Sequence, residues 1–595
     1  MRGQSPSRRV LSTLGLRRTL ASYERVTDRK GRADRNARPS LRKATPPSSR
    51  QLSPTSCPEL LAVMVRCHVS MAFPTVEIRR RPSMAFFAIL ATVMVIGSYL
   101  FVILLAAGCV YFPYFFLSRS DSVSGSVVLL FLFGIIIAAT MLWIPRRDAF
   151  TAPGMLLERS AYPRLFAEID SIAAALNEPV PREVYLIGNA NAFVADRGGV
   201  MGFGSRRIMG LGLPLLSTMT VSQFRAVLAH EFAHYYGGDT SLGPWVYRTK
   251  ASIVRIFENV GSVRQLARIA VLGLMYMFVT TLLKWYFVTF LRIINLVSRR
   301  QEYRADELAC LVAGRQNLID GLRAIHRTAA VWPAYWKQEV LPVLSMGSLV
   351  ALGDGLTRFM AVPHISEAIG KGLETRLREE KTKPYDTHPP LRDRIAAVQK
   401  LPDGYALQDS QPASCLLENL QNAEILFVEN CVDDLRPGSL NYVSWDEVAL
   451  RVTIPGWQQF VSEYSEPLRG VTAESLPDQV PKLREIGSRI RDPKGMLLSP
   501  DQRTARAGGL FAAALALAMI RSGWDLQIGP GMFRMSRGNH EFNPFLAVNQ
   551  LMTNKLSREA WTSRCQELGL SQLILLPSSL SEHKPEPSSQ AELFS

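Results

Sequence analysis

The stretch VLAHEFAHYYGGD, residues 227–239, places two histidines four positions apart, with a glutamate directly after the first. On a helix, positions four apart differ in direction by about 40°, so His230 and His234 project side by side and can hold one Zn²⁺ at about 2.0–2.1 Å. Glu231 points roughly 100° away, where it does not compete as a ligand but can reach a water molecule beside the ion. The pattern therefore predicts a hydrolytic zinc helix. Two histidines on an unrelated helix are the alternative, because short HExxH matches also arise by chance.

The residues around this stretch set the bounds of the expected helix. Thr220 is followed three positions later by Gln223, which is a capping box. Gly237 and Gly238 form a typical C-terminal stop signal. We therefore expect one helix that begins after Thr220 and runs through both histidines to these glycines.

A second motif offers a third ligand. SRRQEYRADELA, residues 298–309, has Glu302 and Asp306 four positions apart on an expected helix. Glu302 would complete a His-His-Glu set and leave a fourth position open, as a catalytic zinc site requires. Asp306 would accept a hydrogen bond from the second nitrogen of a ligand imidazole. Taken alone, the segment is more typical of a solvated charged helix face.

A third fragment, YDTHPPLRDRI, covers residues 385–395. His388 stands just before two prolines that hold the chain extended. Its imidazole would be placed to donate to the oxyanion of a tetrahedral intermediate. Arg394 is expected to anchor this loop or to add positive charge. A plain turn leading into a helix is the alternative.

Two long apolar runs precede these motifs. Residues 84–117 contain no charged residue and exceed the roughly 20 residues that a spanning helix needs, and residues 127–144 form a second run. Residues 84–148 are therefore predicted to form a transmembrane hairpin. Arginines flank it at 79–81 and 146–147, and the positive-inside rule places both ends in the cytoplasm.

A third apolar stretch, residues 266–297, lies between the two halves of the expected site and is interrupted by Lys284. One full crossing would put those halves on opposite sides of the bilayer. Two crossings need about 40 residues and a turn, more than this stretch contains. We therefore predict a long helix that dips into the membrane or lies along it.

The formal net charge of +17 is concentrated at the front of the chain. Residues 1–83 contain 18 Lys and Arg and 5 Asp and Glu, scattered among Ser, Pro and Gly. This composition predicts a disordered extension and argues against nucleic-acid binding, which needs basic residues on a folded face. An organelle transit peptide and an over-extended start, with synthesis from Met64, Met71 or Met84, are both open. The seven cysteines are widely spaced without a CxxC pair, which favours a reducing compartment.

The composition turns soluble after about residue 403, where no catalytic signature is found. The 14-residue run AGGLFAAALALAMI is too short to span a membrane and is expected to be a buried helix. We expect a mainly α (α+β) chain in five parts: a disordered basic extension (1–83), a transmembrane hairpin (84–148), a catalytic domain (149–402), a mostly helical domain (403–576) and a disordered tail (577–595).

Taken together and in this order, the three motifs resemble the membrane zinc metallopeptidases of the HtpX heat-shock protease and CAAX prenyl endopeptidase type. AVLAHEFAHYYGGD, SRRQEYRADELA and DTHPPLRDRI carry the resemblance. The stretch around Asn191, Ala192 and Phe193 also resembles the family's strand region before the catalytic helix. The resemblance covers about residues 84–400. The stretch between HExxH and the third ligand is shorter than the four-span layout of the heat-shock type requires.

The resemblance implies a gluzincin-like helical fold with a small edge-strand sheet. It implies one Zn²⁺ held by His230, His234 and Glu302, with Glu231 as the base. It also implies that peptide substrate adds to an edge strand through main-chain hydrogen bonds. That strand is expected within residues 201–212, at Phe203, Gly204, Ser205 and Ile208.

We therefore expect a multi-pass zinc endopeptidase of the cell membrane, with its catalytic domain facing the cytoplasm. Its partners would be the lipid bilayer and membrane-associated or misfolded polypeptides, and not nucleic acid; the oligomeric state stays open. One alternative is a catalytically silent scaffold that keeps zinc for stability, which the presence of Glu231 disfavours. The other is a membrane-surface binding module whose working part is the basic front end.

Overall fold

The structure is a computed structural model of the whole chain. It describes residues 82–119, 150–198, 205–235, 270–380, 388–404, 408–432, 435–490 and 499–576, together with single residues between 125 and 135. The predicted disordered extension up to residue 81, the tail 577–595 and most of the second apolar run, 127–144, lie outside the described residues. The described part is mostly helical with three small sheets, in agreement with the expected mainly α class.

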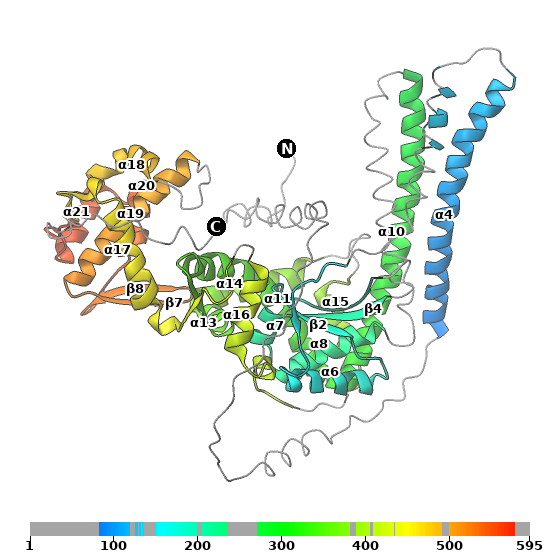
Figure 1. Cartoon of the computed structure of the whole chain (residues 1–595), viewed down its shortest axis with the longest axis horizontal. Coiled ribbons are helices and arrows are strands. Elements are labelled where there is room, and N and C mark those ends of the chain that lie inside the picture. The colour runs from blue at the N-terminus through cyan, green and yellow to red at the C-terminus, as the bar shows by residue number, and fades with distance from the viewer. Residues whose placement is uncertain are drawn as a thin grey trace, which may run out of the picture. The chain divides into compact units, whose positions relative to one another are not determined.

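Two long helices, α4 (Pro82–Leu117) and α10 (Ala270–Ala313), lie side by side (Figure 1). The ring of Tyr286 in α10 stacks on Phe101 of α4 with 4.5 Å between the ring centroids. The hydroxyl of Tyr286 also donates a hydrogen bond to the carbonyl oxygen of Met94. These contacts join the first apolar run of the chain to the third.

Two helices of the described residues are long and apolar enough to cross a membrane, judged by length and composition. The first is Thr92–Leu117 within α4, which exposes apolar side chains such as Leu104. The second is α19 (Pro500–Arg521), whose apolar residues are mostly buried inside the protein. The expectation that this second run is a buried helix is therefore confirmed.

The third apolar stretch does not form a helix of its own. From Ala270 onward it is the first part of α10, which continues without a break through Glu302 and Asp306 to Ala313. At 1.5 Å per residue this helix is about 66 Å long. The two segments that the sequence analysis treats separately are thus one rigid element, and the apolar stretch and the third ligand lie at different heights along it.

A four-stranded sheet flanks the motif helix. Its order is β1-β2-β4-β3; β2 and β4 run parallel, and the other neighbours pair antiparallel. The strands are β1 (Met155–Leu157), β2 (Glu183–Ile187), β3 (Ala192–Arg197) and β4 (Arg206–Gly212).

This order corrects the predicted substrate strand. Ile208 lies in β4, where it pairs with Glu183 on one side and with Ala195 on the other, so its backbone faces no open edge. Ser205 precedes β4, and Phe203 and Gly204 lie outside the described residues. The described part of the stretch forms β4 inside the sheet, and the edge strands are β1 and β3.

The helices and turns of the first body surround this sheet. They are α6 (Pro163–Ala175), α7 (Leu213–Thr218), α8 (Val221–Ala233), α11 (Arg315–Tyr335), η4 (Trp336–Val340), α12 (Leu341–Leu344), α13 (Leu352–Ala361), α14 (Pro363–Glu379), α15 (Leu391–Val398), η5 (Ala413–Leu416), α16 (Leu420–Cys431), η6 (Trp445–Glu447) and η7 (Ala449–Thr453). A parallel pair, β5 (Ser348–Val350) and β6 (Asn441–Val443), joins the middle of this body to its end.

The buried core of the first body does not end at residue 403, where the sequence analysis places a boundary. One apolar cluster runs from Met155 to Val452 and includes Phe427 and Trp445. A separate cluster begins at Val461. The core therefore divides about fifty residues later than expected, because η5, α16 and β6 pack onto the sheet and helices before them.

The second body is built around α19 and contains Trp561 as its largest fully buried side chain. Its remaining helices and turns are α17 (Ile454–Glu463), η8 (Glu466–Leu468), η9 (Leu476–Lys482), α18 (Leu483–Arg489), α20 (Pro544–Met552) and α21 (Arg558–Glu567). It also holds an antiparallel sheet of β7 (Asp525–Gly529), β8 (Met532–Arg537) and β9 (His540–Phe542), which the sequence analysis does not foresee.

Candidate metal centre and active site

The helix α8 carries the HExxH motif through the core. Thr220 caps it, and the predicted capping box with Gln223 is confirmed by both of its hydrogen bonds. The helix ends at Ala233, earlier than the glycine signal suggests, but His234 keeps a helical conformation as the C-cap. The buried Phe232 and its apolar neighbours fix α8 against the rest of the body, and this holds the orientation of the two imidazoles.

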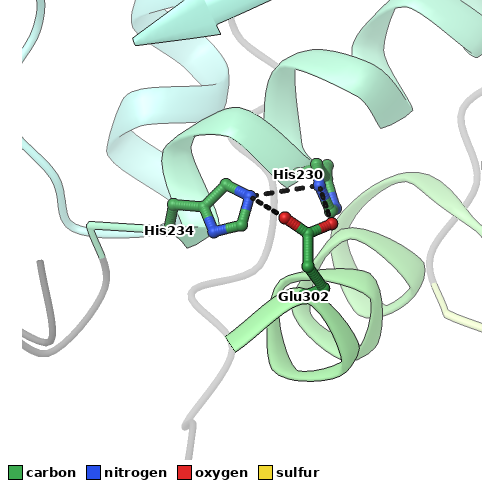
Figure 2. A group of neighbouring side chains, drawn as sticks. All are labelled: His230, His234 and Glu302. Atoms are coloured by element: carbon green, nitrogen blue, oxygen red, sulfur yellow. Dashed lines mark hydrogen bonds and ion pairs between the residues drawn. The ribbon is translucent and has the colours of Figure 1, made fainter. Parts of the chain in front are cut away.

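The three predicted ligands meet at one point, as Figure 2 shows. The Nε2 atoms of His230 and His234 lie 3.2 Å apart. Glu302 reaches them from α10, with Oε2 3.6 Å from Nε2 of His230 and Oε1 3.5 Å from Nε2 of His234. The packing of α8 against α10 produces this meeting, although the residues are about seventy positions apart in the sequence.

This donor set fits a zinc ion. Tetrahedral ligands with bonds of about 2.0–2.1 Å lie roughly 3.3 Å from one another, close to the three separations observed. Oε2 of Glu302 is buried and has no hydrogen-bond partner among the described residues. The Arg394 guanidinium lies 3.3 Å from this oxygen without a hydrogen bond between them, so the oxygen keeps lone pairs that a metal ion can bind. Two imidazoles and one carboxylate are also the ligand types of a catalytic zinc site.

Asp306 and Arg394 support the ligand residues from behind. Oδ1 of Asp306 lies 3.1 Å from Nδ1 of His230, so the proton on Nδ1 points to the carboxylate and Nε2 keeps its lone pair for a metal. Arg394 lies with Nη2 2.6 Å from the same carboxylate oxygen and Nη1 3.3 Å from Oε2 of Glu302. Although burial opposes its ionisation, the neighbouring Arg394 charge holds the pKa of Asp306 below its ordinary value.

Glu231 lines the same cavity as the ligands but is not one of the three side chains that meet there. Burial raises the pKa of its carboxyl to about 7. A carboxylate with a raised pKa is a better proton acceptor than an exposed one. Glu231 is therefore placed and tuned to exchange a proton with a molecule in the cavity.

His388 reaches the metal centre from the turn before α15. Its Nδ1 lies 2.8 Å from Oε1 of Glu302, and this hydrogen bond raises the pKa of its imidazole. The side chain remains 68% exposed, so the rest of the ring faces the cavity and solvent. The geometry places a hydrogen-bond donor beside the metal centre.

The cavity also reaches the open edge of the sheet. The amide of Gly212 donates to the carbonyl of Asn191, and the antiparallel ladder alternates from there, so the N–H and C=O of Ala192 point away from β4. Ala192 and Phe193 line the cavity next to the metal ligands. The main chain of β3 at Ala192 can therefore pair with an extended peptide.

Tyr235, which the sequence analysis does not single out, limits this open edge. Its hydroxyl donates to the carbonyl of Val194 and accepts from the amide of Asp196. Beyond Val194 the edge of β3 is thus covered by a side chain from the end of the motif helix. Tyr235 follows His234 directly in the sequence, but no local pattern there points to a contact with a strand some forty positions earlier.

Comparison with known proteins gives a consistent result. The sequence model of peptidase family M48 matches residues 160–401 of this chain. Protease HtpX of Psychrobacter sp. is 26% identical over 272 residues, 44% of this chain and 78% of that protein. Protease HtpX of Idiomarina loihiensis is 26% identical over 289 residues, 46% of this chain and 86% of that protein. Protease HtpX of Xylella fastidiosa (strain M12) is 30% identical over 190 residues, 30% of this chain and 61% of that protein. No solved structure matches.

Proposed function

We propose that this chain is a membrane-anchored endopeptidase with one Zn²⁺ held by His230, His234 and Glu302. The proposal starts from the family: residues 160–401 belong to peptidase family M48, which makes the chain a metallopeptidase. The observation that carries the proposal is the meeting of these three side chains at tetrahedral separations beside the carboxylate of Glu231. Its substrates would be membrane-associated or misfolded proteins, cleaved at the cytoplasmic face.

In this proposal each side chain of the cavity has a separate role in peptide-bond hydrolysis. When bound, Zn²⁺ supplies Lewis acidity to the scissile carbonyl and to the attacking water. Glu231 removes a proton from that water and delivers it to the leaving amine. His388 donates a hydrogen bond to the oxyanion. Asp306 and Arg394 keep the imidazole of His230 in the required tautomer and orientation.

The main chain of β3 would orient the substrate. An extended peptide that pairs with Ala192 is held by backbone hydrogen bonds that any sequence can form. This corrects the strand but keeps the mode of binding that the resemblance implies. The first step of selectivity then depends on whether a segment is unfolded enough to become extended.

The membrane part of the proposal is supported by α4 and by the first part of α10. Their apolar surfaces, with exposed side chains such as Leu104 and Trp285, fit a lipid environment better than water. Because Glu302 lies on the same helix as Trp285, about 25 Å further along, the metal centre would stand close to the bilayer but outside it.

The test is cleavage of an unfolded membrane protein by purified protein in detergent, with the variant Glu231→Gln and with metal analysis of both. We expect the wild type to bind one zinc and to cleave. The variant should keep the zinc and lose at least about 100-fold in rate, because only proton transfer is removed. Equal rates for the two proteins would leave a zinc-stabilised scaffold as the better reading.

A further inference from the structure

The cavity that holds the metal ligands continues past them along two further helices. Its volume is about 720 Å³. The wall of this extension is an apolar face of α11 that ends in a polar residue: Leu318, Leu322, Ile325 and His326. Their spacing is that of one face of a helix, so the wall is about 12 Å long. Leu318 and Leu322 are buried at the base of this wall, and Ile325 and His326 are only partly buried.

A second helix, α14, packs against α11 and contributes charged residues to the polar end of the cavity. Arg376 of α14 donates to the carboxylate of Glu380 through Nε and Nη2, at 3.2 and 3.0 Å. Glu380 also accepts a hydrogen bond from the amide of Leu391, the first residue of α15, at 3.3 Å. The carboxylate thus ties α14 to the turn that carries His388, and both Arg376 and Glu380 line the cavity.

His326 stands at this end without a fixed partner. Neither of its ring nitrogens hydrogen-bonds to a residue that the structure describes. Burial, reinforced by the charge of Arg376, lowers the pKa of its imidazole to about 4. At neutral pH the ring is therefore uncharged and offers one donor and one acceptor to whatever enters the cavity.

We propose that this extension is the subsite for a substrate side chain beside the scissile bond, and that it selects a large side chain with an apolar body and a hydrogen-bonding end, such as tyrosine. The apolar face of α11 contacts the body of that side chain, and His326 hydrogen-bonds its end. Successive side chains of an extended peptide point to opposite faces, so only one of the two residues at the scissile bond enters the subsite. The inference rests on the proposed function.

The first test uses the full-length wild type and no substitution in the protein. A peptide series carries Tyr, Phe, Leu or Ala at each of the two positions flanking the cleaved bond, and mass spectrometry locates the cut. On one side only, we expect kcat/KM to fall at least about tenfold from Phe to Ala. On the same side Tyr should exceed Phe by about 2- to 10-fold, the worth of one neutral hydrogen bond. Equal values for Tyr and Phe on both sides would overturn the inference.

The second test removes the hydrogen bond at the end of the wall. His326→Phe should bring the ratio of Tyr to Phe close to one, and this ratio, not the absolute rate, is the quantity that decides the test. The matched control is His364→Phe, which alters an exposed histidine at the start of α14 and should leave both rates unchanged. An unchanged ratio in His326→Phe would contradict the role of this residue, and His326→Leu repeats the measurement if the first variant does not fold.

A third variant tests the apolar wall. Ile325 is the partly buried apolar residue of this wall, so Ile325→Trp narrows the extension and should move the preference on the sensitive side toward Ala by about tenfold or more. A size preference that does not change would contradict the assignment of this face of α11. Glu231→Gln accompanies every series: if the wild type shows no cleavage that depends on Glu231, the proposed function fails and the inference fails with it. Glu231-dependent cleavage without a side-chain preference overturns the inference alone.

Discussion

Arg394 is the residue whose role depends most on its surroundings. It is buried between two carboxylates, 2.6 Å from Asp306 and 3.3 Å from Glu302. Its guanidinium joins α15 to α10 through these ion pairs and places a positive charge beside the site. A buried charge of this kind is stable only when every partner is present, so removing any one of the three would leave the others unpaired.

Glu424 is a second buried carboxylate, far from the ligands in the sequence. It is 1% exposed and accepts hydrogen bonds from the amides of Leu352 and Gly353 at the start of α13, at 3.1 and 2.8 Å. Among the described residues its partners are these two amides and the Tyr442 hydroxyl, and none of them is a cation. Burial therefore raises its pKa from an ordinary value of 4.5 to about 7.

This shift predicts how the stability of the protein changes with pH. Between pH 4.5 and 7 the folded chain holds a proton on Glu424 that the unfolded chain releases, so the free energy of unfolding falls as the pH rises through this range. The loss amounts to at most about 3 kcal/mol. Glu424→Gln removes the titration, so the stability of the wild type relative to the variant should decline from pH 5 to pH 8.

Thermal unfolding of both proteins in detergent measures this difference. Glu463→Gln, at an exposed position of α17, is the control and should show a difference that does not change with pH. A relative stability of the wild type that is constant or increases over this range would contradict the assignment.

At the scale of elements, strand β3 has the open edge that faces the metal ligands. Its ladder with β4 turns the N–H and C=O of Ala192 away from β4, and the hydroxyl of Tyr235 covers the edge from Val194 to Asp196. The usable edge is therefore short. It should bind only the few residues of a peptide that lie around the scissile bond.

Peptides that are N-methylated at one residue at a time test this limit. Methylation of the amide that pairs with Ala192 removes a hydrogen bond and adds a clash, so kcat/KM should fall by about tenfold or more at one or two positions. Methylation further along the peptide should have little effect, because Tyr235 already occupies that edge. Uniform losses along the peptide, or no loss at all, would be inconsistent with pairing at β3.

The whole molecule contains two apolar cores, and the first extends beyond the family match. Residues after 401 tie down the start of α8: the amide of Val221 donates to Gln411, and the amide of Ala413 donates to Met219. Ser222 and Asp409 exchange hydrogen bonds at 2.6 and 3.1 Å. The metal-binding helix is thus positioned by a segment outside the matched residues.

Truncation shows which part of the chain the catalytic body needs. A chain that ends after residue 452 keeps the first core intact and should retain bound zinc and at least half of the peptidase activity. A chain that ends after residue 401 loses Phe427 and Trp445, whose burial contributes several kcal/mol, and should fail to fold. The two truncated chains are compared by zinc content, limited proteolysis and peptide hydrolysis. An active chain that ends at residue 401 would refute the prediction that the catalytic body needs residues 402–452.

The structural features that depend on local residue spacing could be predicted from the amino-acid sequence. The four-residue interval of His230 and His234, the capping box at Thr220 and the uncharged length of residues 84–117 each follow from the geometry of a single helix. The buried character of α19 was predicted from its uninterrupted apolar run of only 14 residues, although the helix itself is longer. The third ligand was found because Glu302 and Asp306 form a helical motif of their own.

The features that depend on residues distant in the sequence could be read only from the folded chain. A strand becomes an edge or an interior strand through its neighbours in the sheet, which is why Ile208 was assigned to an edge that belongs to β3. The continuity of α10, the end of the first core at Val452 and the placement of His326 in the same cavity as the metal ligands likewise depend on long-range packing. No local pattern contains that information, because burial and pairing are properties of the assembled chain.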